Sequence, residues 1–298
     1  MSTLKVFRIP VSIEHQLYCE DIGDNSKDAL IYVHGGPGLG CEEKHRNQFD
    51  LNKYRVILID QRGCNRSTEQ GNISENTTDL LIKDIEMLRK RLKLEKITLL
   101  GSSWGTVVAL GYARNYPQQV KELILKSPFL ATENDFSWAY TPSGIAAKLK
   151  DSWKQFSEFH PQGGKELLKV YAEKIQNTET QKQTAIQWLN WEGALYFFHR
   201  PQENMLFSEE SITPYWINVA KIQIHYASHS FFIQPNETLA WVDEIRKNKI
   251  PCRALHGSLD EVVPLQQTLQ LQERWPEMQL KIIKEADHKI PESELKSL

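Results

Sequence analysis

Short apolar runs and amphipathic segments alternate through the first part of the chain. Each run of four or five mostly apolar residues ends at a glycine or a polar residue, which is typical of a central strand buried on both faces of a parallel sheet. Between the second and third runs, Leu81, Ile85, Leu88 and Leu92 recur at helical spacing and predict a helix with one apolar face. Another helix is predicted to begin just after Ser103. The runs predicted to be strands are 30–33, 55–59, 97–100 and 122–125.

The pattern changes near residue 131. Between 131 and 240 the strand-like runs fade, and the chain becomes helical, polar and rich in tryptophan. Two further strand-like runs follow at 252–256 and 280–283. We therefore predict an α/β fold with a mostly parallel, doubly wound sheet. Its core is expected to consist of 1–130 together with 241–298, and its inserted helical cap of 131–240.

Composition narrows the class of protein. The 298 residues contain 36 Lys and Arg against 38 Asp and Glu, so the net charge of −2 lacks the basic excess of a nucleic-acid binder. No apolar run approaches the roughly 18 residues needed to span a bilayer, and the first residues contain no apolar signal segment. The four cysteines form no C-x-x-C pair, and no metal signature occurs. We expect a cytoplasmic protein that uses no cofactor, metal, nucleic acid or membrane.

The strongest chemical signal is the GSSWG segment at 101–105. It fits the G-x-S-x-G pattern of a nucleophile elbow, and it lies between a predicted strand and a predicted helix, as that motif requires. Small residues on both sides of Ser103 relieve crowding in a sharp turn and expose its hydroxyl. The N-terminal amides of the following helix favour negative charge at this point. Ser103 is therefore predicted to be a catalytic nucleophile.

A serine nucleophile needs a base, and the base needs an acid that orients it. Asp260 follows the strand predicted at 252–256, and His288 follows the strand predicted at 280–283, in the chain order expected for this motif. We predict that His288 is the general base and that Asp260 orients its imidazole. Glu261 is the rival acid and Asp287 a weaker one, because the neighbour of a histidine has poor geometry for this bond.

Other histidines have weaker claims to a role in catalysis. His256 precedes the predicted acid turn, where a structural role is more plausible. His225 and His229 fall in the insert, and the sequence leaves open whether they contact a ligand or are ordinary surface or core residues.

Two glycine-containing loops are expected beside the nucleophile. The HGGPG segment at 34–38 lets backbone amides approach a substrate closely, and such a loop supplies one oxyanion donor while the residue after the nucleophile supplies the other. We assign these donors to the N–H groups of Gly36 and Trp104. The polar loop 60–67 is expected to cross-link the loops around the site. Its Cys64 has no nucleophile motif of its own.

These segments together resemble one family. HGGPG, DQRGCNRS, GSSWG, NWEG, LHGSLDEVVP and ADHKI occur here in the order and at the spacing found in proline iminopeptidases, a family of α/β hydrolases. The resemblance implies an α/β-hydrolase fold and release of N-terminal proline from a peptide through an acyl-enzyme. It also implies that acidic cap residues hold the substrate ammonium group. Glu192 matches one of them, whereas Gln223 stands where the second carboxylate is usual.

The departure at Gln223 leaves two activities open. A glutamine still accepts a hydrogen bond through its carbonyl oxygen but brings no charge, so a carboxylesterase or amidase that needs no free amine is the alternative. Other cap carboxylates at Glu203, Glu209 or Glu210 offer possible compensation. The aromatic residues of the insert, Trp191 among them, are candidates for a pocket around a small apolar ring. A small peptide or ester is the expected substrate, and a hydrolase-fold binder without catalysis is a third, disfavoured hypothesis.

Overall fold

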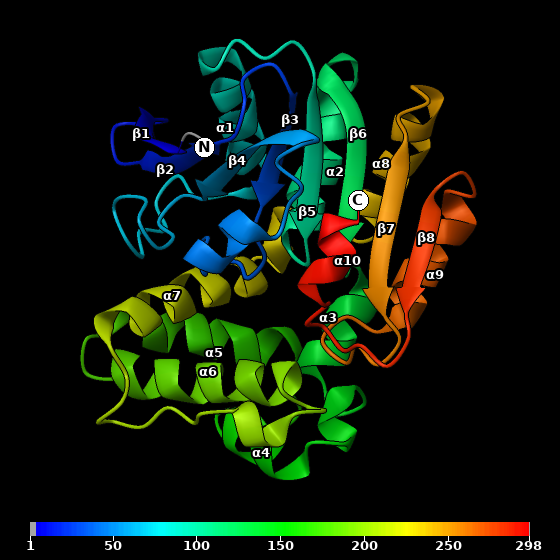
Figure 1. The fold of residues 1–298 in the computed structure, drawn as a ribbon. Coiled ribbons are helices and arrows are strands. Elements are labelled where there is room, and N and C mark those ends of the chain that lie inside the picture. The colour runs from blue at the N-terminus through cyan, green and yellow to red at the C-terminus, as the bar shows by residue number, and fades with distance from the viewer. Residues whose placement is uncertain (1–3, 298) are drawn as a thin grey trace.

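The computed structural model describes residues 4–297, and its centre is an eight-stranded sheet with the order β1-β2-β4-β3-β5-β6-β7-β8 (Figure 1). The six strands from β4 to β8 in this order pair in parallel with one another. β2 pairs antiparallel with both of its neighbours, β1 and β4. The strands are β1 Leu4–Pro10, β2 Gln16–Ile22, β3 Asp28–Val33, β4 Tyr54–Asp60, β5 Ile97–Ser102, β6 Val120–Lys126, β7 Cys252–Gly257 and β8 Gln279–Ile283.

The central strands are buried on both faces. All residues of β4 and β5 are buried, which is the burial that their continuous apolar runs predict. The six strands expected from the sequence are β3 to β8. The antiparallel pair β1 and β2 was not predicted, because its alternation of charged and apolar residues is weak.

The register of the parallel strands brings their following loops to one edge of the sheet. Val33 at the end of β3 lies opposite Ile59 of β4 and opposite Gly101 of β5. Ser102 lies opposite Lys126 at the end of β6. The segments that follow β3, β4 and β5 therefore meet, and these are the three segments in which the sequence placed chemistry.

Helices cover both faces of the sheet. Leu81, Ile85 and Leu88 of α1 are buried, as predicted, in the larger apolar cluster together with residues of α2, α8 and α9. The other face packs against Leu295 of α10 and Phe49 in a smaller cluster. The helices of this part are α1 Thr78–Arg91, α2 Gly105–Asn115, α8 Glu237–Lys247, α9 Leu265–Arg274 and α10 Glu292–Lys296, with 3-10 helices η1 Glu43–Asn47 and η2 Pro117–Gln119.

A group of helices lies beyond the carboxyl ends of the strands, toward which β5, β7 and β8 point in Figure 1. Its interior is aromatic: Trp188 and Phe156 meet edge-on, and Phe156 stacks on Tyr171 at 4.9 Å between ring centroids. The elements are α3 Glu133–Tyr140, η3 Ile145–Ala147, α4 Lys150–Phe156, α5 Gly164–Gln176, α6 Gln181–Tyr196, η4 Pro201–Glu203, α7 Pro214–Ser228 and η5 Ser230–Phe232. We call α3 to α7 the cap; the residue limits predicted for it stay a prediction.

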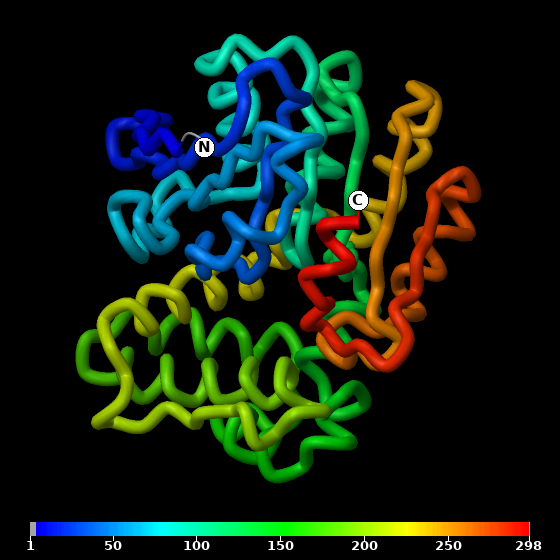
Figure 2. The backbone as a smooth tube through the Cα atoms, in the orientation of Figure 1, coloured from blue at the N-terminus to red at the C-terminus, as the bar shows by residue number. Residues whose placement is uncertain are grey.

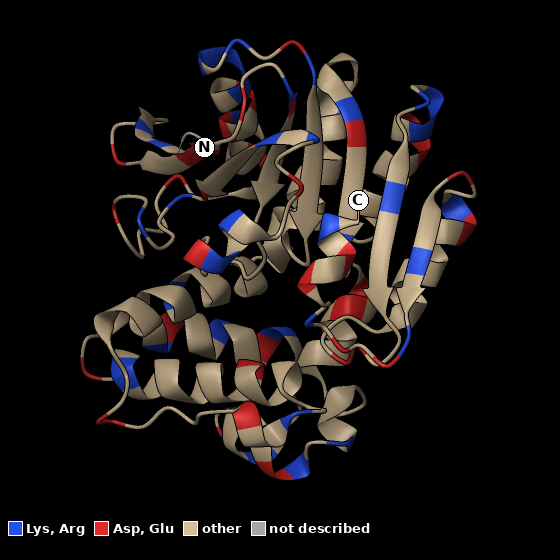
Figure 3. Cartoon of the chain, viewed as in Figure 1, with Lys and Arg blue, Asp and Glu red and all other residues tan. Residues whose placement is uncertain are grey.

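Charged residues of both signs are interspersed over the elements, and neither sign dominates the view in Figure 3. Within residues 4–297, no helix has the length and apolar character required to cross a bilayer.

Candidate active site

Ser103 lies in a sharp turn between β5 and α2. Its φ of 52° is in the left-handed region, which a residue with a side chain adopts only where the surroundings impose it. The turn is held by two hydrogen bonds: Ser103 N–H donates to the carbonyl of Lys126 at 2.8 Å, and Thr106 N–H donates to the carbonyl of Ser103 at 2.9 Å. Gly105 packs directly on the carbonyls that end β3, where a Cβ atom does not fit. The motif therefore has the strand–turn–helix geometry that the sequence predicted.

Asp260 and His288 meet across 28 residues of sequence. The Nδ1 of His288 lies 2.7 Å from Oδ2 of Asp260, and Oδ1 of Asp260 accepts hydrogen bonds from the N–H groups of Val262 and Val263 at 3.0 and 2.9 Å. Because an ionised carboxylate only accepts, Nδ1 carries the proton and Nε2 keeps its lone pair. This is the tautomer that a general base needs.

Burial by itself raises the pKa of Asp260, but the charges of His288 and His256 and the hydrogen bonds from His288 and Val263 outweigh it. The pKa is therefore lowered from its ordinary value, and the carboxylate stays ionised. Among the described residues, the Ser103 hydroxyl takes part in no hydrogen bond, so Ser103 and His288 are not hydrogen-bonded to each other in this conformation. Such contacts commonly tighten only when substrate binds.

Both rival acids point elsewhere. Glu261 pairs with Lys148 of the cap at 2.6 Å, and Asp287 pairs with Arg200 at 2.7 Å. Each of these ion pairs joins a residue near the acid–base pair to the segment that contains the cap helices. Asp260 is therefore the carboxylate that contacts His288.

The three other histidines weighed from the sequence contact backbone carbonyls in the structure. The buried ring of His256 contacts the carbonyl of Val263 at 2.9 Å and the hydroxyl of Thr268 at 2.7 Å. His225 contacts the carbonyl of Asn76 at 2.9 Å, and His229 contacts the carbonyl of His225 at 2.7 Å. Cys64 is buried, and burial raises the pKa of its thiol far above the ordinary value, so it is a neutral thiol rather than a nucleophile.

The HGGPG loop lies against the nucleophile turn. A Cβ atom built on Gly35 comes within 3.2 Å of Cβ of Ser103 and 3.1 Å of the carbonyl oxygen of Ser102, so a side chain here would press the two turns apart by a few tenths of an ångström. Within residues 4–297, the N–H groups of Gly36 and Trp104 have no hydrogen-bond acceptor. The two amides assigned to the oxyanion therefore remain available beside Ser103.

Helix α7 links this loop to the cap. A Cβ atom on Gly38 lies 2.9 Å from the carbonyl oxygen of Val219, and Figure 2 shows α7 running beside the loop after β3. One face of α7 continues from Val219 to Tyr226, whose ring lies 4.9 Å from that of Trp104. Gln223 falls on the same face between them.

Gln223 is buried, with 8% of its surface exposed, and its Oε1 accepts a hydrogen bond from Nε1 of Trp188 at 2.9 Å. An indole N–H can only donate, so this bond fixes the orientation of the amide. The sequence suggested that the Gln223 carbonyl oxygen could accept a hydrogen bond from the substrate, but this oxygen already accepts one from Trp188. The other group at the end of the side chain is the NH₂ group, which can only donate.

Glu192 lies one helical turn after Trp188 on α6. Its Oε1 is 3.5 Å from the hydroxyl of Tyr140, and the Tyr140 ring stacks on Trp188 at 5.7 Å. Part of the Glu192 side chain remains accessible, yet the cap surrounds it closely enough that burial raises its pKa to about 7. Glu192 and Gln223 are therefore connected through Trp188 and Tyr140.

Other cap residues are not where the sequence suggested. Trp191 is 1% exposed, stacks on Phe156 at 5.0 Å and donates its indole N–H to the carbonyl of Ala139, so it belongs to the interior of the cap and offers no face to a substrate. The three cap glutamates considered as compensation have other partners. Glu203 pairs with Arg200, Glu209 with Lys182, and Glu210 with the hydroxyl of Ser208.

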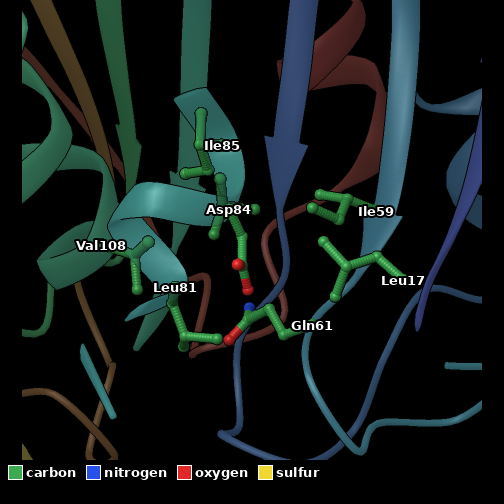
Figure 4. Close-up of a pocket in the computed structure, with 8 residues that line it drawn as sticks. Leu17, Ile59, Gln61, Leu81, Asp84, Ile85 and Val108 are labelled. Carbon is green, nitrogen blue, oxygen red and sulfur yellow. The ribbon is translucent and has the colours of Figure 1, made fainter. Parts of the chain in front are cut away.

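A small cavity lies under the site rather than in it. It has a volume of about 10 Å³, which is room for one water at most, and the side chains of Asp84 and Gln61 point into it among aliphatic neighbours (Figure 4). Arg62 pairs with Asp84 of α1 at 2.7 Å, and Arg66 pairs with Glu20 of β2 at 2.5 Å, so charges of the loop 60–67 do cross-link neighbouring segments. Within residues 4–297, no three His, Cys, Asp or Glu side chains are grouped as a metal site.

Two buried residues were not singled out from the sequence. His34 and Gln61 are both buried and take part in five hydrogen bonds, of which three join different loops: two between Gln61 and His34, and one between Gln61 and Trp104. Both residues come directly after a buried strand, and this position could have identified them. From the sequence, the function of these two loops was assigned to the glycines and charged residues that follow His34 and Gln61.

A strand order with a parallel centre, a serine at a β–α turn and an acid–base pair at the same edge define an α/β hydrolase. The sequence model of the α/β hydrolase fold matches residues 28–295 of the chain. Among solved structures, an esterase from Thermogutta terrifontis superposes with a TM-score of 0.64 at 20% identity, covering 98% of this chain and 93% of that one. This likeness supports the fold alone.

Curated relatives define the family within that class. A proline iminopeptidase of Arabidopsis thaliana is 33% identical over 285 residues, which cover 94% of this chain and 74% of the relative. A proline iminopeptidase of Xylella fastidiosa is 34% identical over 283 residues, which cover 93% of this chain and 88% of the relative. The chain belongs to the proline iminopeptidase family of α/β hydrolases, as the motifs of its sequence predicted.

Proposed function

We propose that this protein is a serine aminopeptidase that releases an N-terminal proline, or a similarly small residue, from short peptides. The observation that carries the proposal is the 2.7 Å contact between His288 Nδ1 and Asp260 Oδ2, at the edge of the sheet where Ser103 forms its turn. The curated relatives are proline iminopeptidases, which gives the substrate class.

In the first step, Oγ of Ser103 attacks the carbonyl carbon of the N-terminal residue while His288 Nε2 removes its proton. The negative charge that forms on the carbonyl oxygen is stabilised by the N–H groups of Gly36 and Trp104. His288 then gives the proton to the amide nitrogen, the C–N bond breaks, and the shortened peptide leaves. Asp260 holds the imidazole in place and stabilises its cationic form.

In the second step, water attacks the acyl-enzyme by the same route in reverse. His288 Nε2 removes a proton from the water, and the tetrahedral intermediate again places its oxyanion between the two amides. Collapse of the intermediate breaks the ester bond, and the proton returns to Ser103 Oγ. The free amino acid is released, and the serine is restored.

An exopeptidase must also recognise the free end of its substrate. Glu192 is the cap carboxylate proposed for this role, because an ammonium group gains a charge-assisted hydrogen bond from it. The alternative partner is Gln223, whose carbonyl oxygen is engaged by Trp188 and whose NH₂ group repels a donor. One carboxylate thus performs the recognition.

Replacing Glu192 by glutamine tests this assignment. Losing a charge-assisted partner costs about 1.5–3 kcal/mol, so kcat/KM for a prolyl amide with a free amine is expected to fall about 10- to 100-fold. The same variant should hydrolyse N-acetylprolyl amide and a simple ester as the wild type does. The measurement compares release of a fluorescent amine from the free and blocked prolyl amides.

Glu210, an exposed cap glutamate bonded to Ser208, provides the matched control, since Glu210→Gln removes the same charge without touching the site.

The thermal stability of Glu192→Gln gives a second control. Because burial holds the pKa of Glu192 near 7, above its ordinary 4.5, the unfolded chain loses this proton first and the folded protein loses stability as pH rises from about 4.5 to about 7. Glu192→Gln should therefore not lower Tm at pH 8. Equal losses on free and blocked substrates contradict the role.

The raised pKa of Glu192 also predicts a pH dependence of binding. Burial keeps the carboxyl group protonated below about pH 7, so the charge that attracts an ammonium group forms only as the pH rises through that value. The KM for a free prolyl amide should fall across this window, until the substrate amine loses its own proton. In Glu192→Gln the KM should stay flat. A wild-type KM that is constant between about pH 6 and 8 counts against the proposal.

A carboxylesterase or amidase with the same nucleophile is the second candidate, favoured by the uncharged Gln223, whose carbonyl oxygen Trp188 engages. An esterase of this kind is expected to cleave simple esters rapidly, to show no preference for a free amine and to be unaffected by Glu192→Gln. The free and blocked substrates described above separate the two activities directly.

A further inference from the structure

The inference concerns how the protein holds its two oxyanion amides, and it rests on the proposed function. Backbone amides stabilise a transition state only if they already point at the place where charge develops. Gly36 belongs to a glycine-containing loop, where the backbone has the greatest freedom to turn away. Something must hold that peptide in place.

The buried imidazole of His34 contacts the loop after β3, which contains Gly35 and Gly36, and the loop after β4, which begins at Gln61. Its Nε2 lies 3.0 Å from the N–H of Gln61, and its Nδ1 lies 2.8 Å from the carbonyl oxygen of Gly35. A backbone N–H can only donate, and such groups face both ring nitrogens: Gln61 N–H lies 3.0 Å from Nε2 and Gly40 N–H lies 3.3 Å from Nδ1. The shorter 2.8 Å contact of Nδ1 with the Gly35 carbonyl oxygen needs a proton on Nδ1, so Nε2 is the acceptor in the neutral ring. Burial lowers the pKa of His34, which keeps the ring neutral. His34 Nδ1–H therefore donates to Gly35.

The bond from His34 to the Gly35 carbonyl also fixes the direction of the Gly36 N–H. The carbonyl of Gly35 and the N–H of Gly36 belong to one peptide unit, which is planar and trans, so the two groups point in opposite directions. When the oxygen is held at the buried imidazole, the Gly36 N–H must point away from it. The orientation of one proposed oxyanion donor is thus set by His34.

The side chain of Gln61 joins this peptide to the second donor. Its Nε2 donates to the carbonyl of His34 at 2.9 Å, and its Oε1 accepts the indole N–H of Trp104 at 3.1 Å. Trp104 carries the other proposed oxyanion amide, and its ring is buried. One side chain therefore spans the two segments whose amides must act on the same oxygen.

We propose that His34 and Gln61 are positioning residues that hold the Gly36 and Trp104 amides in the geometry of the oxyanion site. Neither side chain touches the substrate. His34 sets the plane of the Gly35–Gly36 peptide, and Gln61 fixes that loop relative to Trp104. Loss of either contact lowers transition-state stabilisation and leaves substrate binding unchanged.

Two isosteric replacements of His34 separate its two bonds. Asn places an amide nitrogen near the position of Nδ1, so His34→Asn can keep the bond to Gly35 and loses the bond from Gln61. Gln places an oxygen near the position of Nε2, so His34→Gln keeps the bond from Gln61 and loses the bond to Gly35. We expect kcat to fall about 10- to 100-fold in His34→Gln with KM unchanged, and clearly less in His34→Asn.

Gln61→Glu supplies an independent variant. A carboxylate still accepts the Trp104 indole N–H but cannot donate to the His34 carbonyl, so that one bond is lost while the backbone N–H of residue 61 still contacts His34 Nε2. The matched control is His15→Gln. His15 is a buried histidine that contacts the carbonyl of Ser74 at 2.7 Å, and its replacement should lower Tm without changing kcat.

The readout is the rate at which a fluorophosphonate labels Ser103, together with kcat and KM for the prolyl amide. Phosphonylation uses the same amides and needs no ammonium recognition, so it reports the oxyanion site even if the aminopeptidase assignment fails. Slow labelling in His34→Gln and Gln61→Glu at normal KM supports the inference. Wild-type labelling rates in both, or losses in His34→Asn equal to those in His34→Gln, overturn it. If His34→Gln does not fold, Gln61→Glu decides.

Discussion

Replacing Ser103 by alanine is expected to reduce kcat for every substrate by about 10⁴- to 10⁶-fold, the largest effect of any single change in this protein. The reason is that the hydroxyl is the atom that forms the acyl-enzyme, and no neighbouring group can take its place. The change removes one oxygen from a half-exposed side chain in a turn held by backbone bonds, so Tm should change little. The measurement is prolyl amide hydrolysis together with fluorophosphonate labelling.

The chain contains its own control for this experiment. Ser102 is the adjacent serine, but it is the last residue of β5, is buried and lies against the hydroxyl of Tyr32. Ser102→Ala should keep labelling and most of the activity. Residual labelling of Ser103→Ala at the wild-type rate contradicts the assignment of the nucleophile. Absence of labelling in the wild type supports the hypothesis of a binder without catalysis.

Replacing Asp260 by asparagine is expected to reduce kcat by about 10⁴-fold. An amide can donate to His288 Nδ1, which stabilises the tautomer with the proton on Nε2, and a protonated Nε2 cannot accept the proton of Ser103. The charge that stabilises the imidazolium is lost at the same time. The measurement is kcat across a pH range, with labelling rates as a second readout.

Glu261 is the matched control for Asp260, because it is the adjacent acid and pairs with Lys148 instead of His288. Glu261→Gln should leave kcat within a few fold and reduce only the attachment of the cap through Lys148. If Glu261→Gln impairs kcat as strongly as Asp260→Asn does, the acid has been misassigned.

Much of the core was predictable from local pattern. The four strands β3, β4, β5 and β6 coincide with the apolar runs, since a strand buried on both faces must be apolar at nearly every position. The face of α1 formed by Leu81, Ile85 and Leu88 follows from helical spacing. The pair β1 and β2 was missed because β1 is largely exposed at the sheet margin and β2 combines charged and apolar residues, so neither strand forms a continuous apolar run.

The candidate site was only partly predictable. Ser103, Asp260 and His288 were assigned from the sequence because chemistry restricts which residue types can act and the fold restricts their order, and their catalytic roles stay a prediction. Trp191 was misplaced as a ligand residue because an aromatic side chain looks the same in a sequence whether it lines a pocket or fills the interior of a cap. Gln223 was correctly noted as uncharged, but the partner of its carbonyl oxygen, Trp188, is 35 residues away.

The sequence by itself determined the class of fold, the nucleophile turn and the family, because hydrophobic periodicity and short motifs are local properties of the chain. Only the tertiary structure decided that Asp260 rather than Glu261 contacts His288, that the Gln223 amide turns its oxygen to Trp188, and that Gln61 spans two loops. These are hydrogen bonds between residues distant in sequence. Which donor meets which acceptor depends on angles and on differences in distance of a few tenths of an ångström, and no local sequence pattern encodes these.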